Sequence, residues 1–65
     1  MLIKRISTLT GITRELDIPV TVEELFLWRV KGAHIQDAMP HLTADEREFL
    51  MTGVTPEEWH NAFGW

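Results

Sequence analysis

The segment TADEREFLMTGVTPEE, residues 43–58, carries two helix starts in succession and decides how the C-terminal half folds. Thr43 stands three residues before Glu46, and Thr55 stands three residues before Glu58. At this spacing the threonine hydroxyl accepts a hydrogen bond from the glutamate amide, and the carboxylate accepts one from the threonine amide. The segment therefore predicts two helices, each begun by a capping box.

Two residues in this segment support the boundaries of the two helices. Gly53 is expected to end the helix that begins at Thr43, and Pro56 suits the first position of the next helix. A third capping box, formed by Thr21 and Glu24, predicts another helix upstream. Three such boxes in 65 residues make the helix boundaries well defined.

The helix that starts at the third box is predicted to run to about Val30 and to end at Gly32. A short helix is predicted over residues 34–39, ended by Pro40. The helical part of the chain therefore spans residues 21–63.

Residues 2–18 are predicted to form a β-hairpin, because β-branched and other apolar residues recur through this segment. Thr10 and Gly11 supply the turn, and Gly11 is suited to a positive φ. Pro19 ends the second strand because it has no amide hydrogen for the ladder.

Two registers of this hairpin place Arg14 on its more apolar face. A two-residue loop gives the pairs Leu9–Ile12, Ser7–Arg14, Arg5–Leu16 and Ile3–Ile18. A three-residue loop shifts the register by one and brings Lys4 and Thr8 to that face instead. In both registers Arg14 shares the face with a second cation.

The whole chain, residues 1–65, is therefore predicted to be a single α+β domain: an N-terminal β-hairpin followed by three or four short capped α-helices. A core of this size rarely contributes more than about 3–5 kcal/mol, and the chain has no cysteine for a disulfide. The helices beginning at Thr21 and Thr43 carry nearly contiguous apolar residues, which implies burial on several sides. The aromatic residues that need cover are Trp28, Trp59, Phe63 and Trp65. We therefore expect a homo-oligomer, a dimer or a tetramer.

Composition excludes several classes of function. Ten acidic against six basic residues, a net charge of -4, disfavour binding to a DNA or RNA polymer. No apolar run is long enough to span a membrane, and the N-terminus lacks the apolar run of a signal peptide. The absence of cysteine makes the cytoplasm the expected location.

Catalytic and metal-binding patterns are also missing from the sequence. There is no cysteine nucleophile, glycine-rich phosphate loop, zinc-protease motif or EF-hand spacing, so we expect a protein that is not an enzyme. His34 and Asp37 would share one face of the short helix, but the positions of His41 and His60 do not force them toward that pair. We expect no metal site and no cofactor.

Arg5, Arg14 and Arg47 remain as candidate binding residues. They would serve either as partners in surface salt bridges or as bidentate donors to a phosphate or carboxylate, which suits the planar guanidinium. Trp28 would provide a surface on which a base stacks, or part of the core. Gln36 would read the edge of a base or cap a neighbouring carbonyl.

The C-terminal half contains two distinctive stretches, Ile35-Gln-Asp-Ala-Met-Pro-His-Leu42 and Arg47-Glu-Phe-Leu-Met-Thr-Gly-Val-Thr-Pro-Glu-Glu-Trp59. With them this half resembles a widespread family of very small phage-encoded proteins. The segments Leu9-Thr-Gly11 and Thr13-Arg-Glu15 are similar to the hairpin of the same family. The likeness covers nearly the whole chain.

This family in turn looks similar to the viral sponges that sequester cyclic dinucleotides from bacterial anti-phage (CBASS) signalling. Such sponges are small, oligomeric and non-enzymatic, and they bind their ligand at subunit boundaries. The resemblance implies ligand contacts at Arg14, Arg47, Thr52 and Gln36, with Trp28 as a stacking surface. Arg5 is a further candidate, because the register with a two-residue loop places it on the same face as Arg14, whereas the other register places Lys4 there. The alternatives are an acidic protein-binding inhibitor of a host enzyme and a small structural or assembly protein.

Overall fold

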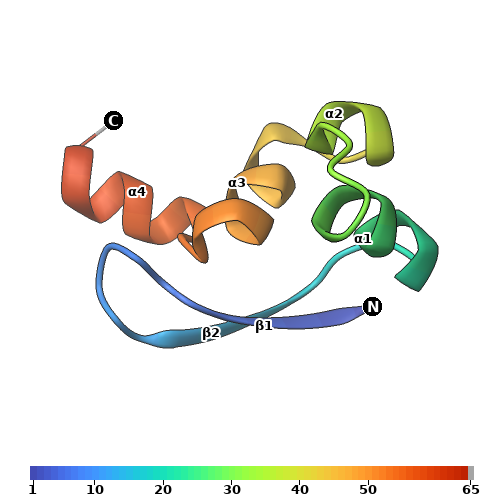
Figure 1. The fold of residues 1–65 in the computed structure, drawn as a ribbon. Helices are drawn as coiled ribbons and strands as arrows, with labels where there is room; N and C mark the ends of the chain where they lie inside the picture. Colours follow the sequence, from blue (N-terminus) through green and yellow to red (C-terminus); the bar gives the residue numbers. More distant parts are fainter. Residues whose placement is uncertain (65) are drawn as a thin grey trace.

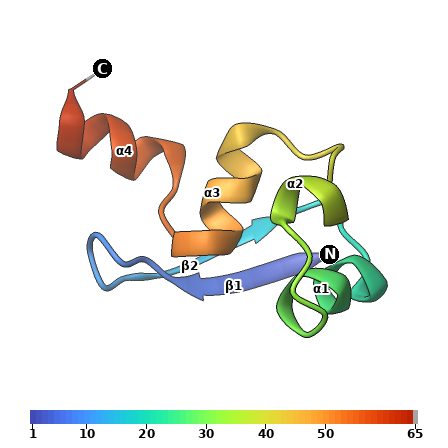
Figure 2. The same cartoon turned by 45° about the horizontal axis from the view of Figure 1, so that its top comes forward.

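The computed structural model describes residues 1–64, so the expectation that Trp65 needs cover lies outside the described residues. Its elements follow one another as a two-stranded hairpin and four helices, which confirms the α+β class and the order of the elements. Their bounds are β1 Leu2–Ile6, β2 Thr13–Asp17, α1 Val22–Arg29, α2 Ile35–Ala38, α3 Ala44–Thr52 and α4 Pro56–Phe63. The helices lie on one side of the hairpin, with α4 over its loop and α1 and α2 near the N-terminus (Figures 1 and 2).

All three predicted capping boxes are present. Thr21, Thr43 and Thr55 each accept from the amide three residues later, and the glutamate at that position accepts from the threonine amide. Gly53 is the left-handed C-cap of α3, and Pro56 occupies the first turn of α4, as predicted. The helix starts were readable because a capping box is formed by residues only three positions apart.

Both predicted hairpin registers are wrong. Arg14 pairs with Arg5, not with Ser7, and Leu16 pairs with Ile3, so residues 7–12 form a longer loop than either prediction allowed. The side chain of Ser7 explains this loop: it is buried, and its hydroxyl accepts from the amides of Leu9 and Thr10. The true register differs from the two-residue-loop prediction by two positions, which keeps every side chain on its predicted face and places Arg5 beside Arg14.

The hydrophobic core lies between the hairpin and the first three helices. Its buried members are Ile18, Val20, Ala38, Met39, Leu42, Phe49 and Leu50. Leu25 and Trp28 of α1 pack against this cluster only in part, and α1 contributes no fully buried residue. Its outer side exposes Phe26 and Leu27 by nearly half, so much of the apolar surface of α1 meets solvent in the single chain.

The hairpin loop meets the junction between α3 and α4 at close range. The amide of Thr8 donates to the carbonyl of Thr52 at 3.0 Å, and Gly53 is buried against the backbone of Ile6. A Cβ at Gly53 would lie 2.5 Å from the Ile6 carbonyl oxygen, and the φ of +77° at this position is unfavourable for other residues. The junction between α3 and α4 therefore requires glycine at position 53, because any side chain would clash with the backbone of Ile6.

Gly53→Ala is expected to destabilise the fold by about 2–4 kcal/mol, because it combines a left-handed backbone with a steric clash. Gly11→Ala is the matched control: its φ of +76° is the same, but a Cβ there meets nothing within 4 Å. The control should cost only about 1 kcal/mol. Urea unfolding of both variants measures the difference, and equal costs would contradict the close approach.

Candidate functional site

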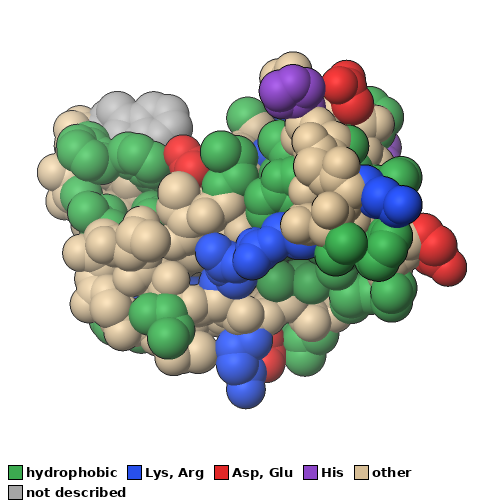
Figure 3. Space-filling model, in the orientation of Figure 1, with side chains coloured by type: hydrophobic (Ala, Val, Ile, Leu, Met, Phe, Trp, Pro, Cys, Tyr) green, Lys and Arg blue, Asp and Glu red, His purple; other side chains and the backbone are tan. Residues whose placement is uncertain are grey.

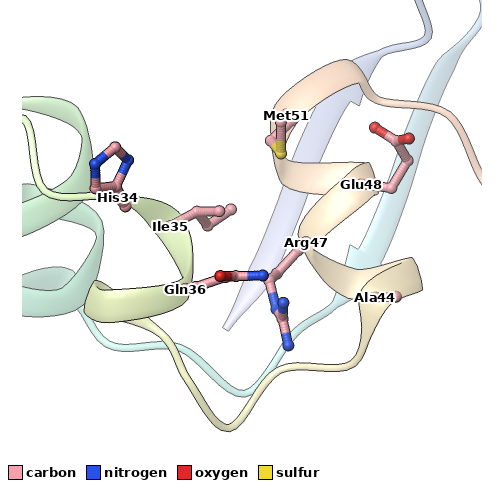
Figure 4. Close-up of a pocket in the computed structure, with 7 residues that line it drawn as sticks. All are labelled: His34, Ile35, Gln36, Ala44, Arg47, Glu48 and Met51. Carbon is pink, nitrogen blue, oxygen red and sulfur yellow. The ribbon is translucent and has the colours of Figure 1, made fainter.

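A hollow lies between α2 and α3 on the described surface, and we call it the α2–α3 cleft. Its volume is about 400 Å³. It is lined by His34, Ile35, Gln36, Ala44, Arg47, Glu48 and Met51, whose side chains Figure 4 shows. This volume falls within the range of small-molecule sites, about 300–1,000 Å³.

Arg47 is the best-fixed charged group in the α2–α3 cleft. Its Nε and one terminal nitrogen donate to the carbonyl oxygen of Leu42, at 3.2 and 2.8 Å. That carbonyl belongs to the loop before α3, so the arginine fastens the loop to the helix. A guanidinium has five N–H donors, and these two bonds leave three for other acceptors.

Gln36 enters the same cleft from α2, so the fold brings together two of the predicted ligand residues. Figure 4 shows Gln36 reaching from α2 toward α3, which carries Arg47. The half-buried Ile35 and the half-exposed Met51 provide apolar walls. Glu48 adds a carboxylate, which accepts from the Thr52 hydroxyl at 3.3 Å. The cleft thus combines a cation, an amide, an acid and apolar surface.

The hairpin arginines lie on its helix-facing side. Arg5 donates to the backbone carbonyl of Met51 at 3.3 Å but is not part of the lining of the α2–α3 cleft, and Arg14 lies opposite it on β2. On the face drawn in Figure 3, basic side chains gather in the middle, between α3 and the hairpin. The prediction that a second cation accompanies Arg14 is therefore confirmed, and that cation is Arg5.

A second hollow lies between the hairpin loop and α4, and we call it the hairpin–α4 cleft. Its volume is about 390 Å³, and it is lined by Leu9, Thr10, Arg14, Glu58, Asn61 and Ala62. Arg14 therefore belongs to a different hollow from Arg47 and Gln36. The six predicted ligand residues do not converge on one point of the single chain.

Glu58 links the two sides of the hairpin–α4 cleft. It is 5% exposed, and one oxygen accepts from the amide of Thr55 at 3.0 Å, as its capping box requires. Its other oxygen accepts from the Thr10 hydroxyl at 2.5 Å and faces Arg14 at 3.5 Å. The Thr10 bond, followed by the Thr55 amide, lowers the pKa of the Glu58 carboxyl from 4.5 to about 2, although burial acts in the opposite direction.

Two of the predicted ligand residues have local structural contacts. The Thr52 hydroxyl donates to the backbone carbonyl of Glu48 at 2.9 Å and accepts from the amide of Val54, so it supports the end of α3. Trp28 packs against the core on one side, and the guanidinium of Arg29 lies 5.2 Å from its ring centre. Neither residue lines either cleft.

Sequence reasoning missed the role of Glu58 and Thr10. Its sequence position predicts only a capping role for Glu58, the same role that Glu24 and Glu46 have in their helices. Nothing local distinguishes the three, because the contact with Thr10 comes from a residue 48 positions away.

Within residues 1–64, no three His, Asp or Glu side chains lie together in a way that would hold a metal ion. None of the helices described is long and apolar enough to cross a membrane. No protein-family model, curated protein or solved structure matches this chain.

Lowering the pH is expected to weaken the fold through Glu58. The folded pKa of about 2 lies below the value of 4.5 expected for an unperturbed carboxyl, so only the unfolded chain takes up this proton between these values. The contribution of Glu58 to stability is therefore complete above pH 4.5 and is lost progressively as the pH falls toward 2. Urea unfolding between pH 7 and pH 3 measures it.

Glu58→Gln should flatten this pH dependence and lower stability at pH 7. Glu46→Gln is the matched control, because Glu46 occupies the same capping position in α3 but accepts only from its own cap among the hydrogen bonds and ion pairs of the described chain. A pH profile for Glu58→Gln as steep as that of the unchanged protein would contradict the role assigned to this carboxylate.

Proposed function

We propose that this protein is a non-enzymatic sponge that binds and sequesters a cyclic dinucleotide, with the α2–α3 cleft as its binding site. One observation carries the proposal: Gln36 and Arg47, from different helices, line one hollow of small-molecule size. Arginine suits a phosphate, and an amide with both donor and acceptor suits the edge of a base. The resemblance to small phage proteins favours the same ligand.

The geometry of Arg47 supports a role in holding a phosphate. Its two bonds to the Leu42 carbonyl fix the guanidinium before any ligand arrives, so binding orders little of the side chain. Arg5 donates to the backbone carbonyl of Met51, a residue of the cleft lining, and is our candidate for a second cation that would contact a ligand with two phosphates. Ile35 and Met51 offer apolar surface for a base.

Self-association is part of this proposal, as a dimer or a tetramer that closes the α2–α3 cleft at a subunit boundary. The single chain leaves apolar side chains of α1 exposed, among them Val22, Phe26 and Val30. These three follow one another at intervals of four residues and so form a stripe along one face of the helix.

As a phage immune-evasion protein, the sponge would act in the cytoplasm of the infected cell.

The same stripe favours a second candidate function, an inhibitor that binds a host enzyme. Contiguous exposed apolar surface marks protein-interaction sites, and the net charge of -4 suits a basic partner. The two candidates differ in what covers the stripe: a second copy in a sponge, a foreign protein in an inhibitor.

A thermal-shift screen against cyclic dinucleotides tests the sponge. Ligand at 100 times its dissociation constant adds about 2.7 kcal/mol, which raises the melting temperature of a domain of this size by more than about 10 °C. The nucleotide should be recovered intact after heating, because no hydrolysis is expected. No shift with any cyclic dinucleotide would overturn the proposal.

Substitutions in the α2–α3 cleft test whether the cyclic dinucleotide binds there. Gln36→Ala should weaken binding about tenfold by removing one base contact, and Arg47→Lys should weaken it at least as much because lysine lacks the bidentate fork. Asn61→Ala is the matched control, since Asn61 is the only other side-chain amide and lines the hairpin–α4 cleft. Binding that tolerates both cleft variants but not the control would place the ligand elsewhere.

Sedimentation equilibrium tests the self-association. The unchanged protein should sediment as a dimer or tetramer, and Phe26→Asp should shift it toward the monomer because it places a charge in the apolar stripe. Glu23→Lys is a charge-changing control on the same helix. A monomer at all concentrations, with or without nucleotide, would contradict this part of the proposal and favour a foreign partner.

A further inference from the structure

The helix-facing side of the hairpin carries positive charge that the described chain only partly neutralises. Arg5 and Arg14 are direct cross-strand partners, so their side chains leave the same face of the sheet. Like charges in this position repel one another. Arg14 has one ion-pair partner in the described chain, Glu58, whereas the hydrogen bond of Arg5 goes to a neutral backbone carbonyl.

Glu58 has no further capacity to bind a ligand. One of its oxygens accepts from both the amide and the hydroxyl of Thr55, and the other accepts from Thr10 and Arg14. A carboxylate offers about four acceptor positions, and all are taken. Glu58 is therefore a fixed anion that orients Arg14.

Arg14, in contrast, has hydrogen-bond donors that the described residues do not use. Its bond to Glu58 is long, 3.5 Å, and its Nε is buried without a hydrogen-bond partner among the described residues. Its side chain is 38% exposed where it lines the hairpin–α4 cleft. Thr10 and Glu58 also line the cleft, but they are hydrogen-bonded to each other. The remaining lining is apolar or amide: Leu9 comes from the hairpin loop and Ala62 from α4, and Asn61 offers a donor and an acceptor.

We propose that the hairpin–α4 cleft binds a carboxylate that is joined to an apolar group, as in the C-terminal residue of a peptide or a free apolar carboxylic acid. Arg14 holds the carboxylate, Leu9 and Ala62 contact the apolar group, and Asn61 bonds an adjacent amide. The singly charged carboxylate fits better than a phosphate dianion, because the fixed charge of Glu58 stands beside Arg14. This site is separate from the α2–α3 cleft and independent of the sponge proposal.

Titration of ¹⁵N-labelled protein with N-acetyl-leucine tests the site. Millimolar binding should shift the amide signals of Leu9, Thr10 and Asn61, whereas N-acetyl-leucinamide, which lacks the carboxylate, should leave them unchanged. Equal shifts with the amide would overturn the proposal, and so would equal binding of acetate or inorganic phosphate, because the apolar group would then contribute nothing. An acetylated tetrapeptide ending in leucine identifies the source: tighter binding than N-acetyl-leucine assigns the cleft to a peptide C-terminus, and equal binding to a free acid.

Two variants test the residues. Arg14→Gln should weaken N-acetyl-leucine binding about tenfold or more. Lys4→Gln removes the same charge from the opposite face of the hairpin and should have no effect. Ala62→Leu leaves the contact between Arg14 and Glu58 in place but fills the cleft, so it should abolish binding of N-acetyl-leucine. Retained binding in Ala62→Leu would overturn the proposal even if Arg14→Gln fails to fold.

Ala62→Leu also separates this inference from the proposed function. A variant that loses N-acetyl-leucine but keeps its thermal shift with a cyclic dinucleotide supports two sites. Loss of both ligands together would overturn the claim that the sites are independent.

Discussion

The attachment of the hairpin loop to the junction between α3 and α4 is the contact on which the other parts of the fold depend. A two-stranded hairpin is marginal in water by itself, and helices of eight or nine residues are shorter than those that persist alone. Each half therefore needs the other. The backbone of Ile6 against Gly53, and the Thr10 hydroxyl on Glu58, join them where the hairpin loop meets the helices.

The distance in sequence over which an interaction acts explains what could be predicted. The capping boxes at Thr21, Thr43 and Thr55 are complete within four residues, and the structure has all three. The hairpin register depends on the buried Ser7 hydroxyl and on the bond from Thr8 to Thr52, a residue far along the chain. Nothing near the turn encodes that contact. The faces of the strands were still predictable, because alternation survives a shift of two residues.

The same contrast between local and distant interactions explains which parts of the candidate sites could be predicted. The chemistry of Arg47 and Gln36 could be predicted from residue type, but their meeting depends on the packing of α2 beside α3. Thr52 serves the end of its own helix, which is a common use of a threonine near a C-cap. The second cleft was missed altogether because its central acid is, in sequence, one capping glutamate among three.

Stability alone does not account for two arginines opposite one another on the hairpin. Their strand neighbours on that face, Ile3 and Leu16, pack against the core, so an apolar residue in place of Arg5 would extend the core and remove the repulsion. Arg14 alone would still neutralise Glu58. A buried donor without a partner and a repulsive pair are local conflicts of the kind that concentrate at functional sites. An anion held by the exposed part of the Arg14 guanidinium would offset the repulsion between the two arginines, and the proposed site would then make the hairpin a binding element as well as a structural one.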